Sequence, residues 1–308
     1  MGPARFFGRT AAVPGASARA AAVVLAAAAA LLLGGCRNAT TAPGAQAAVR
    51  IAGTVWQPDA QTVHPQGIWE RLGARTLLVQ WTARDGHAFV DGCPAAGAVE
   101  PPQPRPDWAR IAREPWAQNV ILGLAAHGDE TAARASVESL VARSRCLAAL
   151  ATPLKVTGWY FPVEVDPTWK DAAGLARQLE GLPRPLWISA YDGANVGPAA
   201  LADWLHGWLP KDVGVFFQDG VGVHARSAPV ARDYLLALRQ RLGPRRVRLI
   251  AEAFRPAPGG GFRPATPEEL VPQLATYGGH EVFLFDGPHY VDTRLVEVLR
   301  EKLVPAGR

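Results

Sequence analysis

Short apolar runs recur along the chain from about residue 50 onward, and helical patterns or turns separate them. A run that is apolar and rich in β-branched or aromatic residues is typical of a parallel strand buried on both faces. Eight runs fit this description, and they are Arg50–Trp56, Thr76–Thr82, Val120–Leu124, Val156–Phe161, Leu186–Ala190, Val213–Phe217, Val247–Ala251 and Val282–Phe285.

Helix signals fall between these runs. Apolar residues recur at helical spacing in Glu130–Ala149, and Pro198–Trp208 begins with the proline that first turns favour. Pro229–Leu242 stops at a Gly-Pro pair, and Thr266 is a suitable N-cap for a further helix. Alternating strands and helices predict a parallel sheet, and eight repeats in roughly 255 residues favour closure into a barrel. We therefore expect an α/β fold, a single (βα)8 TIM barrel over residues 50–308.

The N-terminus predicts a targeting segment. Arg5, Arg9 and Arg19 precede the uncharged run Ala20–Leu33, which is shorter than the roughly 20 residues of a bilayer span. The ending Leu-Gly-Gly-Cys resembles a bacterial lipobox, which implies cleavage before Cys36, lipidation of its thiol and anchoring to a membrane. We expect a signal peptide at residues 1–35 and a flexible tether at 36–49. The alternative is an uncleaved signal anchor.

Removing residues 1–35 changes the charge balance. The mature chain keeps 32 − 3 = 29 basic and 27 acidic residues, a net charge of +2. No basic run is interleaved with aromatic residues, so we expect no nucleic-acid partner. Arg37 after the cysteine resembles the sorting signal for the outer membrane, so we expect the cell envelope as the location.

Cysteine usage leaves one question open. Besides Cys36, the chain has Cys93 and Cys146, which in an oxidising compartment form either a disulfide or two separate buried thiols. Neither lies in a CxxC pattern, and no HExxH, GxGxxG or phosphate-loop motif occurs. We expect neither a metal nor a cofactor.

Polar and aromatic residues cluster at the ends of the predicted strands, which meet at one mouth of such a barrel. Aromatic faces can stack on sugar rings, while amides and carboxylates bind hydroxyl groups. This mixture predicts a carbohydrate cleft, with the substrate-binding candidates Trp56, Gln57, Gln80, Trp81, Tyr191, Gln218, Asp219, Asp286, His289 and Tyr290.

Two glutamates are the candidate catalytic residues. Glu164 and Glu252 lie at the ends of the fourth and seventh predicted strands. A carboxylate beside a core must be paired or solvated, and glycoside hydrolysis needs two carboxyl groups across the scissile bond. The structural alternative is that each glutamate pairs with an arginine at the barrel rim, and Arg255 is a candidate partner of Glu252.

The arrangement resembles that of clan A glycoside hydrolases, and more narrowly an uncharacterised bacterial family of glycoside-hydrolase-like (βα)8 barrels, often lipoproteins. The resemblance covers nearly all of the chain after Arg50. It implies that Glu164 is the acid/base and Glu252 the nucleophile. Val163 departs from the pattern, because clan A enzymes usually place an asparagine there that binds the sugar's 2-hydroxyl. The segments that carry the likeness are GTVWQPD, LLVQWT, GWYFPVEVD, WISAYDG, FQDGVGVH, AEAFRP and FDGPHY.

These features lead to one main hypothesis and two others. The main hypothesis is a lipid-anchored, retaining glycoside hydrolase that acts on envelope or extracellular polysaccharide. The first alternative is a barrel that binds carbohydrate without turnover and serves polysaccharide export or attachment. The second is a barrel hydrolase that cleaves amide or phosphate bonds, for which the glycine-rich stretch at residues 258–261 supplies flexible backbone.

Overall fold

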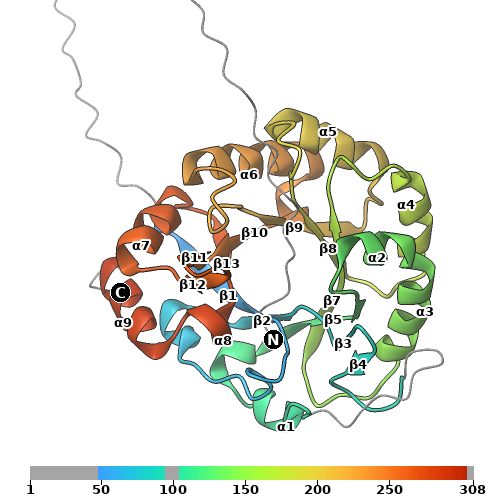
Figure 1. Cartoon of the computed structure of the whole chain (residues 1–308), viewed down its shortest axis with the longest axis horizontal. Helices are drawn as coiled ribbons and strands as arrows, with labels where there is room; N and C mark the ends of the chain where they lie inside the picture. The colour runs from blue at the N-terminus through green and yellow to red at the C-terminus, as the bar shows by residue number, and fades with distance from the viewer. Residues whose placement is uncertain (1–47, 94–103, 304–308) are drawn as a thin grey trace, which may run out of the picture.

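The computed structural model describes residues 48–93 and 104–303 and shows a closed parallel barrel (Figure 1). The strands follow one another around the ring in the order β1-β13-β10-β9-β8-β7-β5-β2, so strands consecutive along the chain are neighbours. The predicted barrel is thereby confirmed. Its strands are β1 (Arg50–Trp56), β2 (Thr76–Val79), β5 (Asn119–Gly123), β7 (Val156–Val165), β8 (Leu186–Ala190), β9 (Val213–Gln218), β10 (Val247–Glu252) and β13 (Glu281–Phe285).

Helices form the outer ring (Figure 1). The predicted helix Glu130–Ala149 is divided at Ser136, whose backbone angles (φ −120°, ψ 21°) leave the helical region. The helices are α1 (Trp108–Ile111), α2 (Glu130–Ala135), α3 (Val137–Ala148), α4 (Ala172–Glu180), α5 (Pro198–Trp208), α6 (Ala228–Leu242), α7 (Pro267–Thr276), α8 (Gly287–Tyr290) and α9 (Thr293–Leu303), with 3-10 turns η1 (Trp69–Leu72), η2 (Pro115–Ala117) and η3 (Pro244–Arg246). None of the helices in the described part of the chain is long and apolar enough to span a bilayer.

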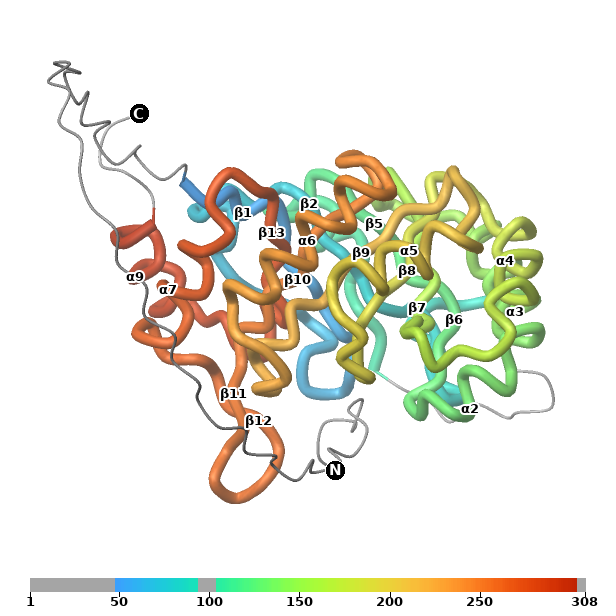
Figure 2. The backbone as a smooth tube through the Cα atoms, turned by 90° about the horizontal axis from the view of Figure 1, so that it is seen from above, coloured from blue at the N-terminus to red at the C-terminus, as the bar shows by residue number. Residues whose placement is uncertain are grey.

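Two small sheets extend the loops that follow the barrel strands. β3 (Ala83–Arg84) pairs with β4 (His87–Ala88) and with β6 (Ala125–Ala126). β11 (Phe254–Pro256) and β12 (Phe262–Pro264) form a hairpin directly after β10. Figure 2 shows this hairpin projecting beyond the body of the barrel. Both additions lie at the carboxyl ends of the strands, where a (βα)8 barrel carries its functional site.

Large side chains fill the barrel interior. The inner cluster is separate from the larger core between strands and helices, and it comprises Val55, Leu78, Ile121, Tyr160, Trp187, Phe216, Ile250 and Phe283. A Cβ atom on Gly214 would lie 2.4 Å from the Trp187 ring. Glycine at this position therefore makes room for the indole, which packs on Phe216 with ring centroids 5.2 Å apart. The barrel is a packed core rather than a pore.

β7 departs from a regular strand next to the candidate site. The predicted strand ended at Phe161, but β7 continues to Val165 after a register shift between Phe161 and Glu164. Val163 packs into the core between strands and helices. Glu164 instead meets the side chain of Gln218 from β9. The two side chains thus lie on opposite faces of the strand, as consecutive strand residues do, and the bulge lies beside the site, where bulges are common.

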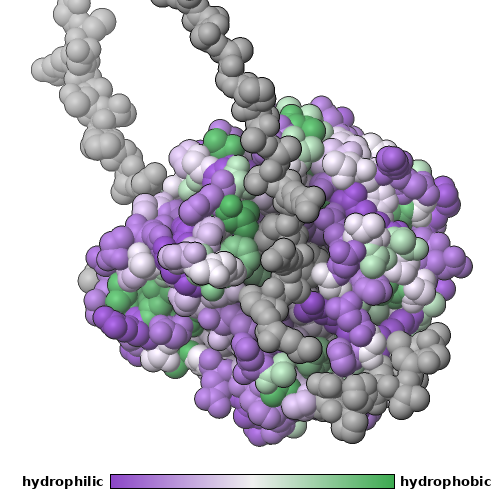
Figure 3. Space-filling view, in the orientation of Figure 1, coloured by the Kyte–Doolittle hydropathy of each residue, from purple (hydrophilic) through white to green (hydrophobic). Residues whose placement is uncertain are grey.

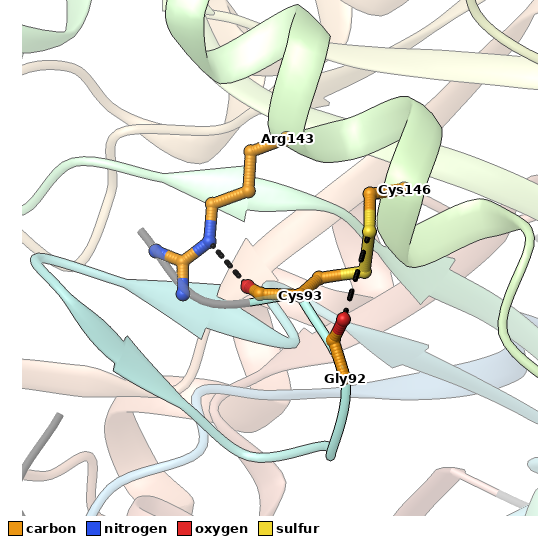
Figure 4. The surroundings of a disulfide bond; sticks show 4 residues. All are labelled: Gly92, Cys93, Arg143 and Cys146. Carbon is orange, nitrogen blue, oxygen red and sulfur yellow. Dashed lines mark hydrogen bonds between the residues drawn. A yellow bond between two sulfur atoms is a disulfide. The ribbon is translucent and has the colours of Figure 1, made fainter. Parts of the chain in front are cut away.

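A disulfide fastens the segment that follows the second barrel strand to the outer ring. Cys93 and Cys146 are bonded, with their Cα atoms 5.9 Å apart (Figure 4). The guanidinium of Arg143 also donates a hydrogen bond to the Cys93 carbonyl at 3.1 Å. Of the two arrangements left open by the sequence, the structure has the disulfide. Cys36, the expected lipidation site, lies outside the described residues.

Candidate active site

Glu164 is an almost buried carboxyl group with one amide partner. Its Oε2 accepts a hydrogen bond from Gln218 Nε2 at 2.8 Å, and the same nitrogen lies 2.7 Å from Ser189 Oγ. Burial and the charge of Glu130 raise the pKa of Glu164 to about 8, although the bond from Gln218 opposes the shift. The group therefore carries its proton at neutral pH, as a general acid must.

Glu252 is fully buried at the end of β10. Its Oε2 accepts a hydrogen bond from the Val223 amide at 3.2 Å, while Oε1 has no partner in the described structure. Burial and the charge of Asp219 raise its pKa well above the usual value for a glutamate. The charge of Glu164 makes a further, smaller contribution to this shift.

Arginine pairing does not account for either glutamate. No ion pair joins Glu164 or Glu252 to a cation among residues 48–93 and 104–303. Arg255 donates to the backbone carbonyl of Glu252 at 3.3 Å and to Gln273 Oε1 at 2.7 Å, and it leaves the Glu252 carboxyl group unpaired. Two carboxyl groups thus lie inside the barrel rim without a structural counter-ion.

Asp219 forms a buried network beneath Glu252. Its Oδ1 accepts from the backbone amides of Val221 and Glu252, and its Oδ2 accepts from Gln273 Nε2 at 2.6 Å and the Tyr277 hydroxyl at 2.8 Å. Burial raises the pKa of Asp219 as well, but these four donors oppose the shift. These hydrogen bonds favour the ionised form of Asp219, and its negative charge in turn raises the pKa of the neighbouring Glu252.

The network includes two residues that the sequence analysis missed. Gln273 and Tyr277 lie four positions apart, on and just after α7. Residues at this spacing share one helix face. The signal that could have revealed them is a glutamine among the apolar residues Leu270 and Leu274 on the buried face of that helix.

The two glutamates lie on the same half of the ring. β8 and β9 separate β7 from β10 on the shorter path, so the strands are three positions apart rather than the four expected for opposite sides. Tyr191, which follows β8, is 7% exposed, and the charges of Glu252 and Glu164 both raise its pKa. The Arg226 guanidinium lies 4.9 Å from the Tyr191 ring. The site is thus built from the neighbouring strands β7 to β10.

A second cluster occupies the other half of the mouth. His289 Nε2 lies 3.0 Å from Asp59 Oδ2, and its Nδ1 lies 3.1 Å from Asp286 Oδ2. Burial disfavours charge on the imidazole, yet the bonds to Asp286 and Asp59 outweigh it and raise the pKa of His289 to about 10. Asp286 also accepts from the Gln57 amide at 2.7 Å. This cluster ties the ends of β1 and β13 together.

Of the remaining predicted site residues, some are buried in the core and others lie at the mouth. Trp56 and Trp81 are 0% and 1% exposed, and their ring nitrogens donate to Thr62 and to the Pro58 carbonyl, so neither ring offers a free face in this structure. This differs from the expected sugar-stacking position, because both indoles fill core space. Gln57 donates to Gln80 at 2.5 Å, and Tyr290 packs on Phe254 at 5.3 Å.

Figure 3 shows mostly hydrophilic residues on this face of the barrel, with smaller hydrophobic patches among them. Within the described residues, no group of three or more histidine, cysteine, aspartate or glutamate side chains is arranged to hold a metal ion.

Comparisons with known proteins give the fold. No family model matches the chain, and no curated protein matches it. Among the solved structures, a putative alpha-L-fucosidase from Bacteroides thetaiotaomicron aligns over 88% of this chain and 98% of its own, at 13% identity and a TM-score of 0.58. A chitinase from Chromobacterium violaceum aligns over 83% and 100%, at 12% identity and a TM-score of 0.45. The first likeness establishes a shared barrel fold.

Proposed function

We propose that the chain is a retaining glycoside hydrolase with its active site between β7 and β10. The observation that carries this proposal is the pair of buried carboxyl groups, Glu164 and Glu252, at the ends of β7 and β10, neither of which forms an ion pair within the described residues. The fold shared with a structure described as a putative alpha-L-fucosidase supports it. Two carboxyl groups at one barrel mouth are the minimum machinery for cleaving a glycosidic bond.

In this mechanism Glu164 donates its proton to the glycosidic oxygen while Glu252, once ionised, attacks the anomeric carbon. The bond to the leaving sugar breaks, and a glycosyl ester forms on Glu252. Glu164, now a carboxylate, takes a proton from water, and the resulting hydroxide releases the sugar and restores Glu252. Binding of substrate must therefore leave Glu252 ionised while Glu164 keeps its proton.

The amide of Gln218 supports this assignment. It lies 2.8 Å from Glu164, so its side chain lies beside the proposed acid/base. We propose that Gln218 binds the sugar hydroxyl next to the reacting carbon, because Val163 faces the outer core. Substrate would then replace one of the two contacts that the Gln218 nitrogen makes now.

The decisive experiment measures turnover by the mature chain from Cys36 onward. A panel of bacterial polysaccharides is assayed for new reducing ends, and 4-nitrophenyl and 2,4-dinitrophenyl glycosides report on the leaving group. Glu164→Gln should lose most of its kcat/KM on 4-nitrophenyl substrates but keep much of it on 2,4-dinitrophenyl ones, whose leaving group needs no proton. Its kcat should stay low on both, because Glu164 also activates water in the second step. Glu252→Gln should lose activity on both kinds of substrate. Full activity in either variant contradicts the assignment.

The pH profile gives an independent check. Since Glu164 is active when protonated and its pKa is raised to about 8, kcat/KM should fall as the pH rises through about 8. On 2,4-dinitrophenyl substrates, Glu164→Gln should lack this alkaline fall. An unchanged fall in the variant would assign the proton to another group.

A second candidate function is carbohydrate binding without turnover, as in export or attachment of polysaccharide. The observation that favours it is the side-chain position of Val163, which leaves no asparagine beside Glu164. Tight binding of a polysaccharide by the wild-type chain, with no reducing ends released after prolonged incubation, would establish this function instead.

We also propose that the mature chain is tethered to the cell envelope through a lipid on Cys36, most simply at the outer membrane. The lipobox-like ending at residues 33–36 supports this proposal. Cys36→Ala should move the protein from the membrane fraction to the soluble fraction. Mass spectrometry of the wild-type N-terminal peptide should show acyl chains, and an unmodified Cys36 would contradict the anchor.

A further inference from the structure

A basic pocket opens at the end of the barrel opposite the candidate active site. It has a volume of about 500 Å³ and includes four arginines and one glutamate, a net charge of +3. Apart from Pro244, Val247 and Gly279, the lining consists of Arg50, Arg239, Arg245, Arg248, His280 and Glu281. The amino-terminal face of a (βα)8 barrel normally serves stability, so a concentration of positive charge there calls for another explanation.

Arg248 is the central residue of this pocket. Its guanidinium lies 4.2 Å from the Trp187 ring centroid and 5.5 Å from that of Phe283, two members of the inner barrel core. No hydrogen bond or ion pair joins it to any residue within 48–93 and 104–303. Burial lowers the pKa of this arginine, and the charge of Glu281 only partly compensates. A cation held this way is costly unless an anion meets it.

The one acid in the pocket does not supply that anion. Glu281 lies 3.1 Å from Arg50, and both side chains are largely exposed, so the pair is weak and leaves Arg239, Arg245 and Arg248 uncompensated. His280 adds a polar atom, because its Nδ1 is buried without a hydrogen-bond partner. The surroundings thus present several donors and no internal acceptor of matching charge.

We propose that this pocket binds a phosphate group, carried either by a soluble phosphorylated molecule or by the headgroup of an anionic lipid. Arginine forks match the geometry of phosphate oxygens, and the surplus of positive charge suits a group that carries about −1 to −2 charges. The volume is large enough for the phosphate together with the group to which it is attached.

The position of the pocket makes a lipid source reachable. Arg50 lines the pocket and begins β1, and the Gly279 amide beside it donates to the Ala48 carbonyl at 3.1 Å. The chain therefore enters the barrel next to the pocket. Arg50 lies 14 positions after Cys36, so the segment between them spans at most about 50 Å when extended. If Cys36 carries the proposed lipid, the pocket lies within reach of the bilayer surface.

The test uses the soluble mature chain with Cys36→Ala in a buffer of low ionic strength without phosphate. Calorimetric titration with inorganic phosphate should show binding. Arg239→Gln and Arg245→Gln should each weaken it about tenfold, since each removes a charge-assisted contact. Arg245 is exposed, so its variant should keep the fold. Arg113→Gln removes the same charge from an exposed position outside the pocket and should bind phosphate as the parent does.

A vesicle arm identifies the source of the phosphate. Flotation is measured with phosphatidylcholine vesicles and with vesicles that also contain phosphatidylglycerol. Binding to the second kind only, lost in Arg245→Gln and competed by inorganic phosphate, indicates a lipid headgroup. Phosphate binding without flotation indicates a soluble ligand. No binding in either arm, or equal loss in Arg113→Gln and Arg245→Gln, would overturn the proposal. None of these readouts depends on glycoside hydrolysis.

Discussion

The two ends of β10 present a basic and an acidic side chain to the barrel axis. Arg248 lies against the inner core near the amino-terminal end, Ile250 belongs to that core, and Glu252 ends the strand at the mouth. The two charged residues are four positions apart, about 13 Å along a strand. Neither has a counter-ion within the described structure. Both side chains are therefore left to interact with a molecule from outside the chain.

The two ends differ in the residues that surround the Glu252 carboxyl group and the Arg248 guanidinium. Glu252 rests on a buried hydrogen-bonded network around Asp219. Arg248 rests on aromatic faces and opens into a pocket. The first setting suits chemistry, where protonation is controlled by burial and a neighbouring acid. The second suits reversible binding of an anion. The predictions below test this contrast.

The largest expected effect is on turnover at the mouth. Glu252→Gln should lower kcat/KM by about 10⁴-fold, since the nucleophile is lost while the shape is kept. The thermal midpoint should not fall, because the buried carboxyl group is costly in the wild type. Asp203→Asn, at an exposed surface ion pair on α5, is the control and should be fully active. A fall of less than about tenfold would remove Glu252 from the mechanism.

A change to Asp219, in the network beneath Glu252, should lower the stability of the fold. Asp219→Asn replaces an acceptor of four hydrogen bonds by a group with one acceptor oxygen. We expect the free energy of unfolding to fall by about 3 kcal/mol, because buried hydrogen-bond donors would be left without an acceptor. The pKa of Glu252 should fall at the same time, because the adjacent negative charge is gone. Urea unfolding measures the first effect, and a variant as stable as the wild type would show that the network is dispensable.

At the amino-terminal end of the barrel, stability should depend on side-chain volume rather than on charge. A Cβ on Gly214 would approach the Trp187 ring to 2.4 Å, so Gly214→Ala should overpack the base of the barrel and cost about 2 kcal/mol. Gly207→Ala is the matched control. Its Cβ would meet nothing within 4 Å on α5, and it should stabilise the chain by about 0.5–1 kcal/mol. Equal effects of the two substitutions would contradict tight packing beneath Trp187.

The sequence predicted the strand order and most element bounds because buried parallel strands leave a strong local pattern. Leu186–Ala190 and Pro198–Trp208 have the limits that the sequence predicts. It did not predict the bulge in β7, which depends on pairing with β8 rather than on local propensity. The burial of Trp56 was also missed, since a residue at a strand end can face either the mouth or the helices.

The candidate site was predictable in its residue types but not in its connections. Glu164, Gln218 and Glu252 follow strands, so their convergence follows from topology. The contact of Asp219 with Gln273 joins residues 54 positions apart, and no local pattern encodes it. The basic pocket was hidden for the same reason, because Arg50, Arg239 and Arg248 come from three distant segments.

The smallest effect should come from His289, which the mouth holds between two carboxylates. The pKa of His289 is raised to about 10 from an ordinary 6.5, so its contribution to stability is complete below pH 6.5 and is lost as the pH rises through about 10. Partial exposure screens the cluster, and we expect a difference of about 1 kcal/mol between pH 7 and pH 10. His289→Gln should show a smaller decline over this range than the wild type, whereas His64→Gln, at an exposed site, should decline as the wild type does. If His289→Gln declined as much as the wild type, Asp59 and Asp286 would not hold a charged imidazole.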